Sequence, residues 1–153
     1  YIKKNRKGIT IGALTTLADI AESADIKEEF KLLADAAHSV ATPQIRNVAT
    51  IGGNLAQDVR CWYYRYPAQI GGPIVCLRKG GKICNALAGD NRYHSIFGSA
   101  PVAERPAEAD GARRRLTFGC VAVGASDLAV ALTALNASIV TDKRILDAQS
   151  FFD

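Results

Sequence analysis

The sequence predicts a single domain of the α+β class, and three observations lead to this prediction. Segments with strand character lie near both ends of the chain, segments with helical periodicity lie next to them, and the centre follows neither period. The chain has 153 residues, 48% of them hydrophobic, so it is long enough to bury a sizeable core. Its formal net charge of +4 is too small, and its apolar content too high, for a fully disordered chain.

A short strand and a first helix are predicted at the start of the chain. Residues 9–11 alternate as Ile-Thr-Ile after a glycine, which indicates a strand. Thr15 and Thr16 are candidate N-caps, because a threonine hydroxyl accepts a hydrogen bond from the free amides of a first helical turn. We expect that helix at residues 17–23.

A second, longer amphipathic helix follows, with Asp25 as its candidate N-cap. Its apolar residues recur at helical spacing, and charged residues occupy the opposite face. We expect this helix to end near Val40, before Thr42-Pro43. The apolar face consists of Ile26, Phe30, Leu33 and Ala37.

Beyond this helix the helical period stops. Residues 44–55 read as a β-like segment that runs into a double glycine. Regular structure is expected again at residues 120–123, followed by Ser126 as the N-cap of a helix at 127–135 and by a strand at 138–140.

The centre of the chain has a different composition. Residues 58–98 are rich in glycine, proline, aromatic residues and cysteine but show little periodicity, and so long a loop is improbable in a compact domain unless something inside it supplies the missing core. Residues 101–115 contain two prolines and many charges, which predicts an exposed insertion. Within it, Arg113–Arg115 is read as a solvated loop because acidic residues lie close upstream.

Four cysteines are the candidate metal ligands: Cys61, Cys76, Cys84 and Cys120. Their spacing is wider than that of zinc fingers or ferredoxin motifs, and no C-x-x-C pair exists. Three of them fall in the aperiodic centre, where a bound metal would supply folding free energy. The spacing alone leaves three interpretations open: unrelated thiols, an iron–sulfur cluster or a zinc site.

The segment Thr50-Ile51-Gly52-Gly53-Asn54 is the candidate cofactor loop. Two glycines let the backbone approach a ligand closely, and we expect their N–H groups to be accessible to phosphate oxygens or ring carbonyls. The pattern matches neither G-x-G-x-x-G nor the P-loop motif, and a plain turn is the alternative interpretation.

Three further features are weaker candidates. Asp127 reads as a first-turn carboxylate favoured by the helix dipole. His94 fits either a metal or anion ligand or a histidine packed in a loop. The aromatic residues at 62–66 fit a stacking platform for bases or an apolar shell around whatever Cys61 binds.

Composition argues against nucleic-acid and membrane functions. The charge is mild and not clustered on one face, so we expect no nucleic-acid partner, although a basic RNA- or DNA-binding domain remains an alternative. The apolar stretch 118–140 approaches the length of a membrane span but contains Asp127, so we expect a buried helix instead.

Taken together, the motifs resemble one known family. Thr42–Leu55 reads TPQIRNVATIGGNL and closely resembles the flavin-binding signature of the medium subunit of molybdenum hydroxylases, the xanthine dehydrogenase and aldehyde oxidoreductase family. Residues 60–65 (RCWYYR) and 89–98 (GDNRYHSIFG) look like the subset that carries an extra [4Fe–4S] cluster, as in periplasmic-type aldehyde oxidoreductases and 4-hydroxybenzoyl-CoA reductases. Residues 120–132 resemble the segment with the last cluster cysteine and an aspartate near the flavin.

The resemblance implies a fold and a set of cofactors. The chain would be the second subdomain of a two-subdomain FAD-binding domain (vanillyl-alcohol-oxidase/PCMH-like), a mixed, largely antiparallel sheet with flanking helices. The family's first flavin loop and its C-terminal domain are expected outside residues 1–153. By resemblance, residues 58–98 hold the [4Fe–4S] cluster on Cys61, Cys76, Cys84 and Cys120, and FAD contacts Thr50, Ile51, Gly52, Gly53, Asn54 and Asp127.

The resemblance also implies a role within a complex. The parent would be the electron-transfer subunit of a molybdenum hydroxylase that oxidises an aldehyde or an aromatic or heterocyclic substrate. Its partners would be a large subunit with molybdopterin and a small subunit with [2Fe–2S] clusters, in the cytoplasm or exported with a partner. The alternative is a zinc-stabilised binding module without a redox role.

Overall fold

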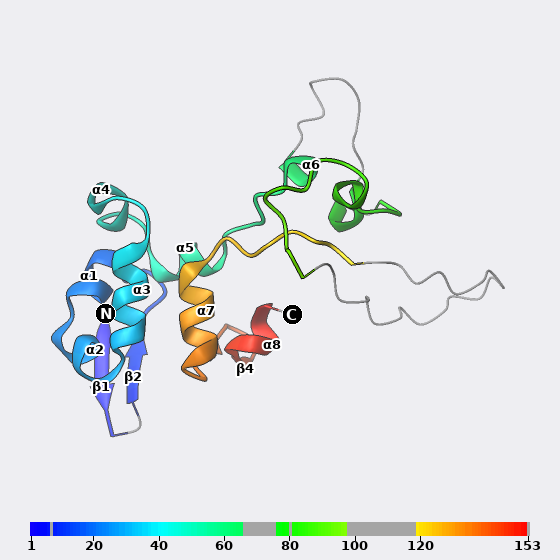
Figure 1. The fold of residues 1–153 in the computed structure, drawn as a ribbon. Coiled ribbons are helices and arrows are strands. Elements are labelled where there is room, and N and C mark those ends of the chain that lie inside the picture. Colours follow the sequence, from blue (N-terminus) through cyan, green and yellow to red (C-terminus); the bar gives the residue numbers. More distant parts are fainter. Residues whose placement is uncertain (7, 66–75, 80, 98–118, 153) are drawn as a thin grey trace. The chain divides into compact units, whose positions relative to one another are not determined.

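A computed structural model of the chain describes residues 1–6, 8–65, 76–79, 81–97 and 119–152 (Figure 1). The chain folds as two compact units. The helical unit comprises Tyr1–Gln57 and Ser126–Asp153, and the cysteine unit comprises Asp58–Ala125. The predicted insertion at 101–115 lies outside the described residues.

The strands of the helical unit form two antiparallel pairs within the described residues. β1 (Ile2–Asn5) pairs with β2 (Gly8–Ile11), with Ile2 opposite Ile11. β3 (Ser138–Val140) pairs with β4 (Ile145–Asp147), and α8 (Ala148–Phe152) follows directly. The predicted strands at 9–11 and 138–140 are confirmed, and with the helices below the α+β class is confirmed as well.

The first predicted helix is confirmed, whereas the second is divided in two. α1 (Leu17–Glu22) begins after Thr16, whose hydroxyl accepts a hydrogen bond from the amide of Asp19. The next helix begins after Ser23 rather than at Asp25, because the Ser23 hydroxyl accepts from the amide of Ile26 at 3.4 Å. This helix is α2 (Ala24–Glu29), and α3 (Lys31–Ser39) is the second part of the predicted helix.

Phe30 separates α2 from α3. Its backbone is not helical (φ −135°, ψ 51°), yet its N–H donates to the Ile26 carbonyl at 2.8 Å and its own carbonyl accepts from Leu33 at 2.8 Å. Hydrogen bonding therefore continues across the bend, and so does the apolar spacing. The periodicity that predicted one helix is the same on both sides of the bend, so it gave no signal of the break.

The prediction of a β-like segment at residues 44–55 is wrong. The structure has two short helices there, α4 (Pro43–Arg46) and α5 (Ile51–Leu55), each with a threonine N-cap. Thr42 with Pro43 at the first helical position starts α4, whereas we expected this pair only to end the preceding helix. The β-like character survives as a single antiparallel bridge between Thr16 and Thr50.

The helix predicted at residues 127–135 is confirmed. α7 (Asp127–Ala134) begins after Ser126, whose hydroxyl accepts from the amide of Ala129 at 3.0 Å. Residues 120–123, by contrast, have neither helix nor strand. Among the described residues, no helix has the length and apolar character needed to cross a membrane.

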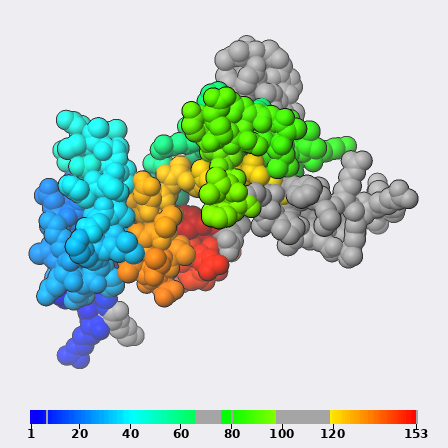
Figure 2. Space-filling model, in the orientation of Figure 1, coloured from blue at the N-terminus to red at the C-terminus, as the bar shows by residue number. Residues whose placement is uncertain are grey.

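One apolar core joins the helices of the helical unit. α3 packs against α1, α2 and α7, and Figure 2 shows the atoms of α3 and α7 in contact. Fully buried aliphatic side chains come from both ends of the sequence, which places residues 126–153 in the same core as residues 1–57. The largest fully buried side chains are Leu17, Ile20, Ile26 and Leu128.

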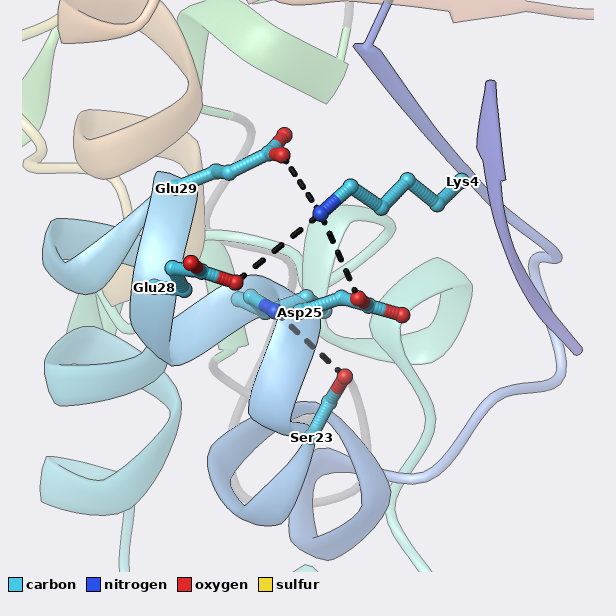
Figure 3. Close-up of polar contacts among 6 residues, drawn as sticks. Lys4, Ser23, Asp25, Glu28 and Glu29 are labelled. Atoms are coloured by element: carbon cyan, nitrogen blue, oxygen red, sulfur yellow. Dashed lines mark hydrogen bonds and ion pairs between the residues drawn. The ribbon is translucent and has the colours of Figure 1, made fainter.

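An ion cluster on the surface links the first strand to the second helix. The Lys4 side chain extends from β1 toward three carboxylates of α2, and its Nζ lies 2.7 Å from Glu29 and 3.5 Å from Asp25 (Figure 3). The third carboxylate, that of Glu28, is 3.9 Å away. The hydrogen bond to Glu29 is the main reason that the pKa of Lys4 is raised. All four side chains are largely exposed, so this contact orients β1 more than it stabilises the unit.

The described part of the cysteine unit contains only short helices. α6 (Trp62–Arg65) follows Cys61, and two 3₁₀ turns follow the next two cysteines. These turns are η2 (Leu77–Lys79) and η3 (Asn85–Leu87).

Candidate cofactor sites

The double glycine lies at the start of α5, pressed against an earlier loop. The N–H of Gly52 donates to the carbonyl of Ala13 at 2.9 Å, and that of Ile51 donates to Thr15 at 3.0 Å. The N–H of Gly53 donates to the Thr50 hydroxyl at 3.2 Å. These amides are therefore satisfied within the chain, and the expectation that they are accessible to a ligand is wrong.

The two glycines have different reasons to lack a side chain. A Cβ at Gly52 would lie 2.9 Å from the carbonyl oxygen of Ala13, which is backbone and cannot move aside easily. A Cβ at Gly53 would meet only the Thr50 hydroxyl, at 3.2 Å. Gly53 is exposed whereas Gly52 is half-buried. Gly52 is thus required for packing, and Gly53 presents open backbone surface.

Asn54 links the glycine segment to α7. Its side chain is 3% exposed, and its Oδ1 accepts a hydrogen bond from the Ser126 hydroxyl at 2.6 Å, between residues 72 positions apart. Ser126 in turn caps α7. Asp127, the first residue of α7, is exposed next to this junction. The fold therefore brings the two predicted flavin segments together, with Gly53 and Asp127 as their exposed members.

All four cysteines line one cavity in the cysteine unit, which we call the cysteine cavity. All four are free thiols; Cys61 and Cys76 are buried, and the other two are half-buried. The cavity is small, about 10 Å³. Among the described residues, no three Cys, His, Asp or Glu side chains converge on a point as ligands of one metal ion would. Other residues that line it are Tyr63, Tyr64, Leu77, Arg78, Asn85 and Ala86.

The backbone next to each cysteine is held by short-range hydrogen bonds. The carbonyl of Cys61 accepts from the amide of Arg65 at 3.0 Å, and that of Cys76 accepts from Lys79 at 2.9 Å. At Cys120 the bond goes to the sulfur itself, because the amide of Ala122 donates to Sγ at 3.4 Å. The first two bonds hold the backbone beside the thiols, and the third fixes the direction of the Cys120 side chain.

Tyr64 connects the first two cysteine segments. Its hydroxyl donates to the Asp58 carboxylate, and its ring lies beneath two cations, Lys79 Nζ at 4.8 Å and Arg78 Cζ at 5.9 Å from the ring centre. The hydrogen bond with Asp58 raises the pKa of Tyr64, and the same bond lowers the pKa of Asp58. Sequence reasoning did not single out Asp58, Arg78 or Lys79, because nothing in their local pattern signals a contact with Tyr64.

Tyr63 connects α6 to the segment after the third cysteine. Its hydroxyl accepts a hydrogen bond from the amide of Asp90 at 2.7 Å. Tyr63 and Tyr64 both line the cysteine cavity, as the interpretation of an aromatic shell requires. Trp62 instead stacks on Tyr93, with ring centres 6.3 Å apart, beside a second cavity of about 290 Å³.

His94 also lines that second cavity. Its two ring nitrogens are shielded from solvent, and neither has a hydrogen-bond partner among the described residues. This arrangement brings His94 near Cys61 but does not add it to the residues around the cysteine cavity.

Comparison with known proteins adds a family to this geometry. Residues 1–153 match the family model described as the FAD binding domain in molybdopterin dehydrogenase. The aldehyde oxidoreductase FAD-binding subunit PaoB of Escherichia coli K12 is 33% identical to the chain over 135 residues, which is 88% of this chain and 36% of PaoB.

Two further relatives are similar over shorter stretches. The nicotinate dehydrogenase FAD-subunit of Eubacterium barkeri is 45% identical over 56 residues, covering 37% of this chain and 19% of that protein. The carbon monoxide dehydrogenase medium chain of Hydrogenophaga pseudoflava is 40% identical over 55 residues, or 36% of this chain and 19% of that protein. The chain thus spans little more than a third of PaoB and about a fifth of the other two.

Proposed function

Since this chain belongs to the family of FAD-binding domains of molybdopterin dehydrogenases, we propose that it carries FAD and a [4Fe–4S] cluster in the electron-transfer subunit of a molybdenum hydroxylase. The cysteine cavity is the observation that supports the cluster. Cysteines spread over residues 61–120 line one small space as free thiols, although nothing in their spacing requires them to meet.

The small size of the buried side chains in the cysteine unit supports the same proposal. Among the described residues of this unit, none of the buried side chains is larger than valine, which is too little for a stable apolar core. Metal ligation would supply the missing folding free energy. The buried hydrophobic residues there are Val59, Cys61, Cys76, Ala86 and Val121.

The donor set fits both a cluster and a zinc ion. Four thiols are the ligand set of [4Fe–4S] clusters and of some zinc sites. The resemblance of residues 60–65 and 89–98 to the cluster-bearing subset of the family favours the cluster. A cluster distributes its four ligands over several iron atoms, so it takes thiols that surround a space without meeting at its centre. We propose that the thiols separate to admit it.

For the flavin, the support comes from the junction of α5 and α7. The hydrogen bond between Asn54 and Ser126 holds the two segments together and leaves Gly53 and Asp127 at the surface. In our proposal FAD contacts this surface through Thr50, Gly53 and Asp127, while Ile51, Gly52 and Asn54 support it from below. The bound flavin supplies the redox chemistry, and the chain holds and orients it.

The complete subunit and its complex are part of the proposal. We propose that the chain is the second part of a larger FAD domain, and that a molybdopterin subunit and a [2Fe–2S] subunit are its partners. An aldehyde or an aromatic or heterocyclic compound is the proposed substrate class. We propose that the complex lies in the cytoplasm, with export alongside a partner as the alternative.

The cluster is tested on the full-length subunit purified from its complex without oxygen. We expect iron, sulfide and a brown colour that bleaches on reduction. A colourless protein with stoichiometric zinc would support the zinc-stabilised module instead, and a protein without either metal would leave the four cysteines as unrelated thiols.

The flavin site is tested by Gly53→Val in the same subunit. We expect loss of FAD with normal iron content, because the new side chain covers exposed backbone in the helical unit and not in the cysteine unit. The matched control is Gly124→Val, at a position where an added Cβ has no neighbour within 4 Å among the described residues. Normal FAD content in Gly53→Val would contradict this site.

A further inference from the structure

One cation lines the cysteine cavity, and a second lies with it over the ring of the same tyrosine. Arg78 lines the cavity itself, and Lys79 follows it in η2. Both lie over the ring of Tyr64, which also lines the cavity. A cation over an aromatic face is attracted to the negative face of the ring, so Tyr64 gives these flexible side chains a preferred position.

The tyrosine is itself held in place from the other end. Its hydroxyl donates to the Asp58 carboxylate, and Asp58 also accepts from the amide of Val59 at 2.9 Å. The Arg65 side chain donates to the carbonyls of Val59 at 2.9 Å and of Asp58 at 3.1 Å. The loop that receives the Tyr64 hydroxyl is therefore closed by four hydrogen bonds, so the ring has a fixed place beside the thiols.

The charges around this ring are unequal. Arg78 and Lys79 contribute two positive charges on the ring side, whereas Asp58 contributes the one carboxylate bonded to the hydroxyl. An iron–sulfur cluster on four thiolates is anionic and becomes more negative when it accepts an electron. Nearby positive charge therefore stabilises the reduced form more than the oxidised form.

We propose that Tyr64 is a positioning residue that holds Lys79 and Arg78 beside the cysteine cavity and thereby raises the reduction potential of the cluster bound there. This inference rests on the proposed function, because it needs the cluster. It adds a role for residues that ligate neither iron nor flavin. In the subunit the effect would make the cluster a better acceptor for electrons within the chain of cofactors.

The test is a redox titration of the cluster in the full-length subunit, followed by electron paramagnetic resonance. Lys79→Gln should move the midpoint potential to a more negative value, because it removes one positive charge near the ring. Lys82→Gln is the matched control, since it removes an exposed lysine charge from the same segment without a contact to Tyr64 in the described structure. We expect the smaller shift from Lys82→Gln.

A double-mutant cycle isolates the role of Tyr64. Tyr64→Leu removes the ring, so Lys79→Gln should then add little further shift. Tyr64→Phe keeps the ring and loses only the hydrogen bond to Asp58, so it should give a smaller negative shift with full iron content; it remains informative if Tyr64→Leu fails to assemble.

Two outcomes separate this inference from the proposed function. If the unmodified subunit contains no iron–sulfur cluster, the proposed function fails, and this inference fails with it. If the cluster is present but neither Lys79→Gln nor Tyr64→Phe changes its potential from that of the unmodified subunit, only the positioning role is overturned. The same holds if Lys79→Gln shifts the potential equally with and without the Tyr64 ring.

Discussion

The helical unit buries large aliphatic side chains from several helices in one core, whereas the described part of the cysteine unit buries small residues and two thiols. Leu17, Ile20 and Leu128 are fully buried in the helical unit. Each such side chain contributes about 1.5–3 kcal/mol of transfer free energy. The cysteine unit has no comparable source among its described residues.

This difference predicts that the two units rely on two kinds of stabilisation. Hydrophobic burial acts in the helical unit without any ligand. In the cysteine unit, the thiols occupy the position that a core would have, so stability there is expected to depend on what they bind.

The largest effect is expected from Cys76→Ser in the full-length subunit. Cys76 is buried and lines the cysteine cavity, so its loss should remove the cluster and unfold the cysteine unit. Hydrogen exchange followed by mass spectrometry should show faster exchange at residues 58–97 and unchanged exchange in α1 and α3. Unchanged protection at residues 58–97 would show that this unit has a core of its own.

Leu17→Ala should act in the opposite unit. Leu17 is 0% exposed, so its truncation leaves a cavity and should lower the free energy of unfolding by about 2–5 kcal/mol. Leu14→Ala is the matched control, because Leu14 is 85% exposed and should change it by less than about 0.5 kcal/mol. Denaturant titration followed by the circular dichroism of the helices measures both, and equal losses would contradict the assigned core.

Asn54→Ala should separate the two segments of the proposed flavin site. The Ser126 hydroxyl would lose its buried acceptor, which should lower the free energy of unfolding by about 1–3 kcal/mol. Ser126→Ala should cost a similar amount, because it also removes the cap of α7. The double variant should be less destabilised than the sum of the single ones, and strict additivity would mean that the two side chains do not act together.

Gly52→Ala and Gly53→Ala should differ in how much they destabilise the helical unit. At Gly52 the methyl group would lie 2.9 Å from a backbone oxygen, so we expect a loss of about 1–3 kcal/mol. At Gly53 it meets a hydroxyl at 3.2 Å, and alanine favours the helix, so the net change should be near zero. Thermal unfolding of the two variants gives the comparison; a larger loss at Gly53 would reverse our assignment of their roles.

The smallest effect concerns pH in the cysteine unit. The pKa of Asp58 is lowered by its bond with Tyr64, so the stability from this bond is present above the ordinary aspartate pKa and is lost as pH falls through the lowered value. The pKa of Tyr64 is raised, so its share is present below the ordinary tyrosine pKa and is lost as pH rises through the raised value. Protease resistance of residues 58–65 should therefore be flat around neutral pH and fall at both extremes.

Tyr64→Phe should remove both of these pH edges without changing the neutral plateau by much, because the contact is exposed. If the acid and alkaline edges persist in Tyr64→Phe, other groups produce them.

Local signals in the sequence were sufficient for several elements. Thr16 and Ser126 cap their helices as predicted, because an N-cap depends only on a hydroxyl and the next three residues. The strands at 9–11 and 138–140 follow from alternation over a few positions. Thr42-Pro43 fits either the end of one helix or the start of the next, and the structure has the start of a helix there.

Neighbouring residues were enough to predict the helix caps and the short strands, and composition marked a segment that holds three of the four cysteines and lacks apolar periodicity. The packing of the elements was needed to show that Asn54 bonds to Ser126, that Gly52 lies against Ala13, and that the thiols share one cavity. It also placed Lys79 over Tyr64. Such contacts join residues that are far apart along the chain, and their geometry follows from how the elements pack, which no local pattern encodes.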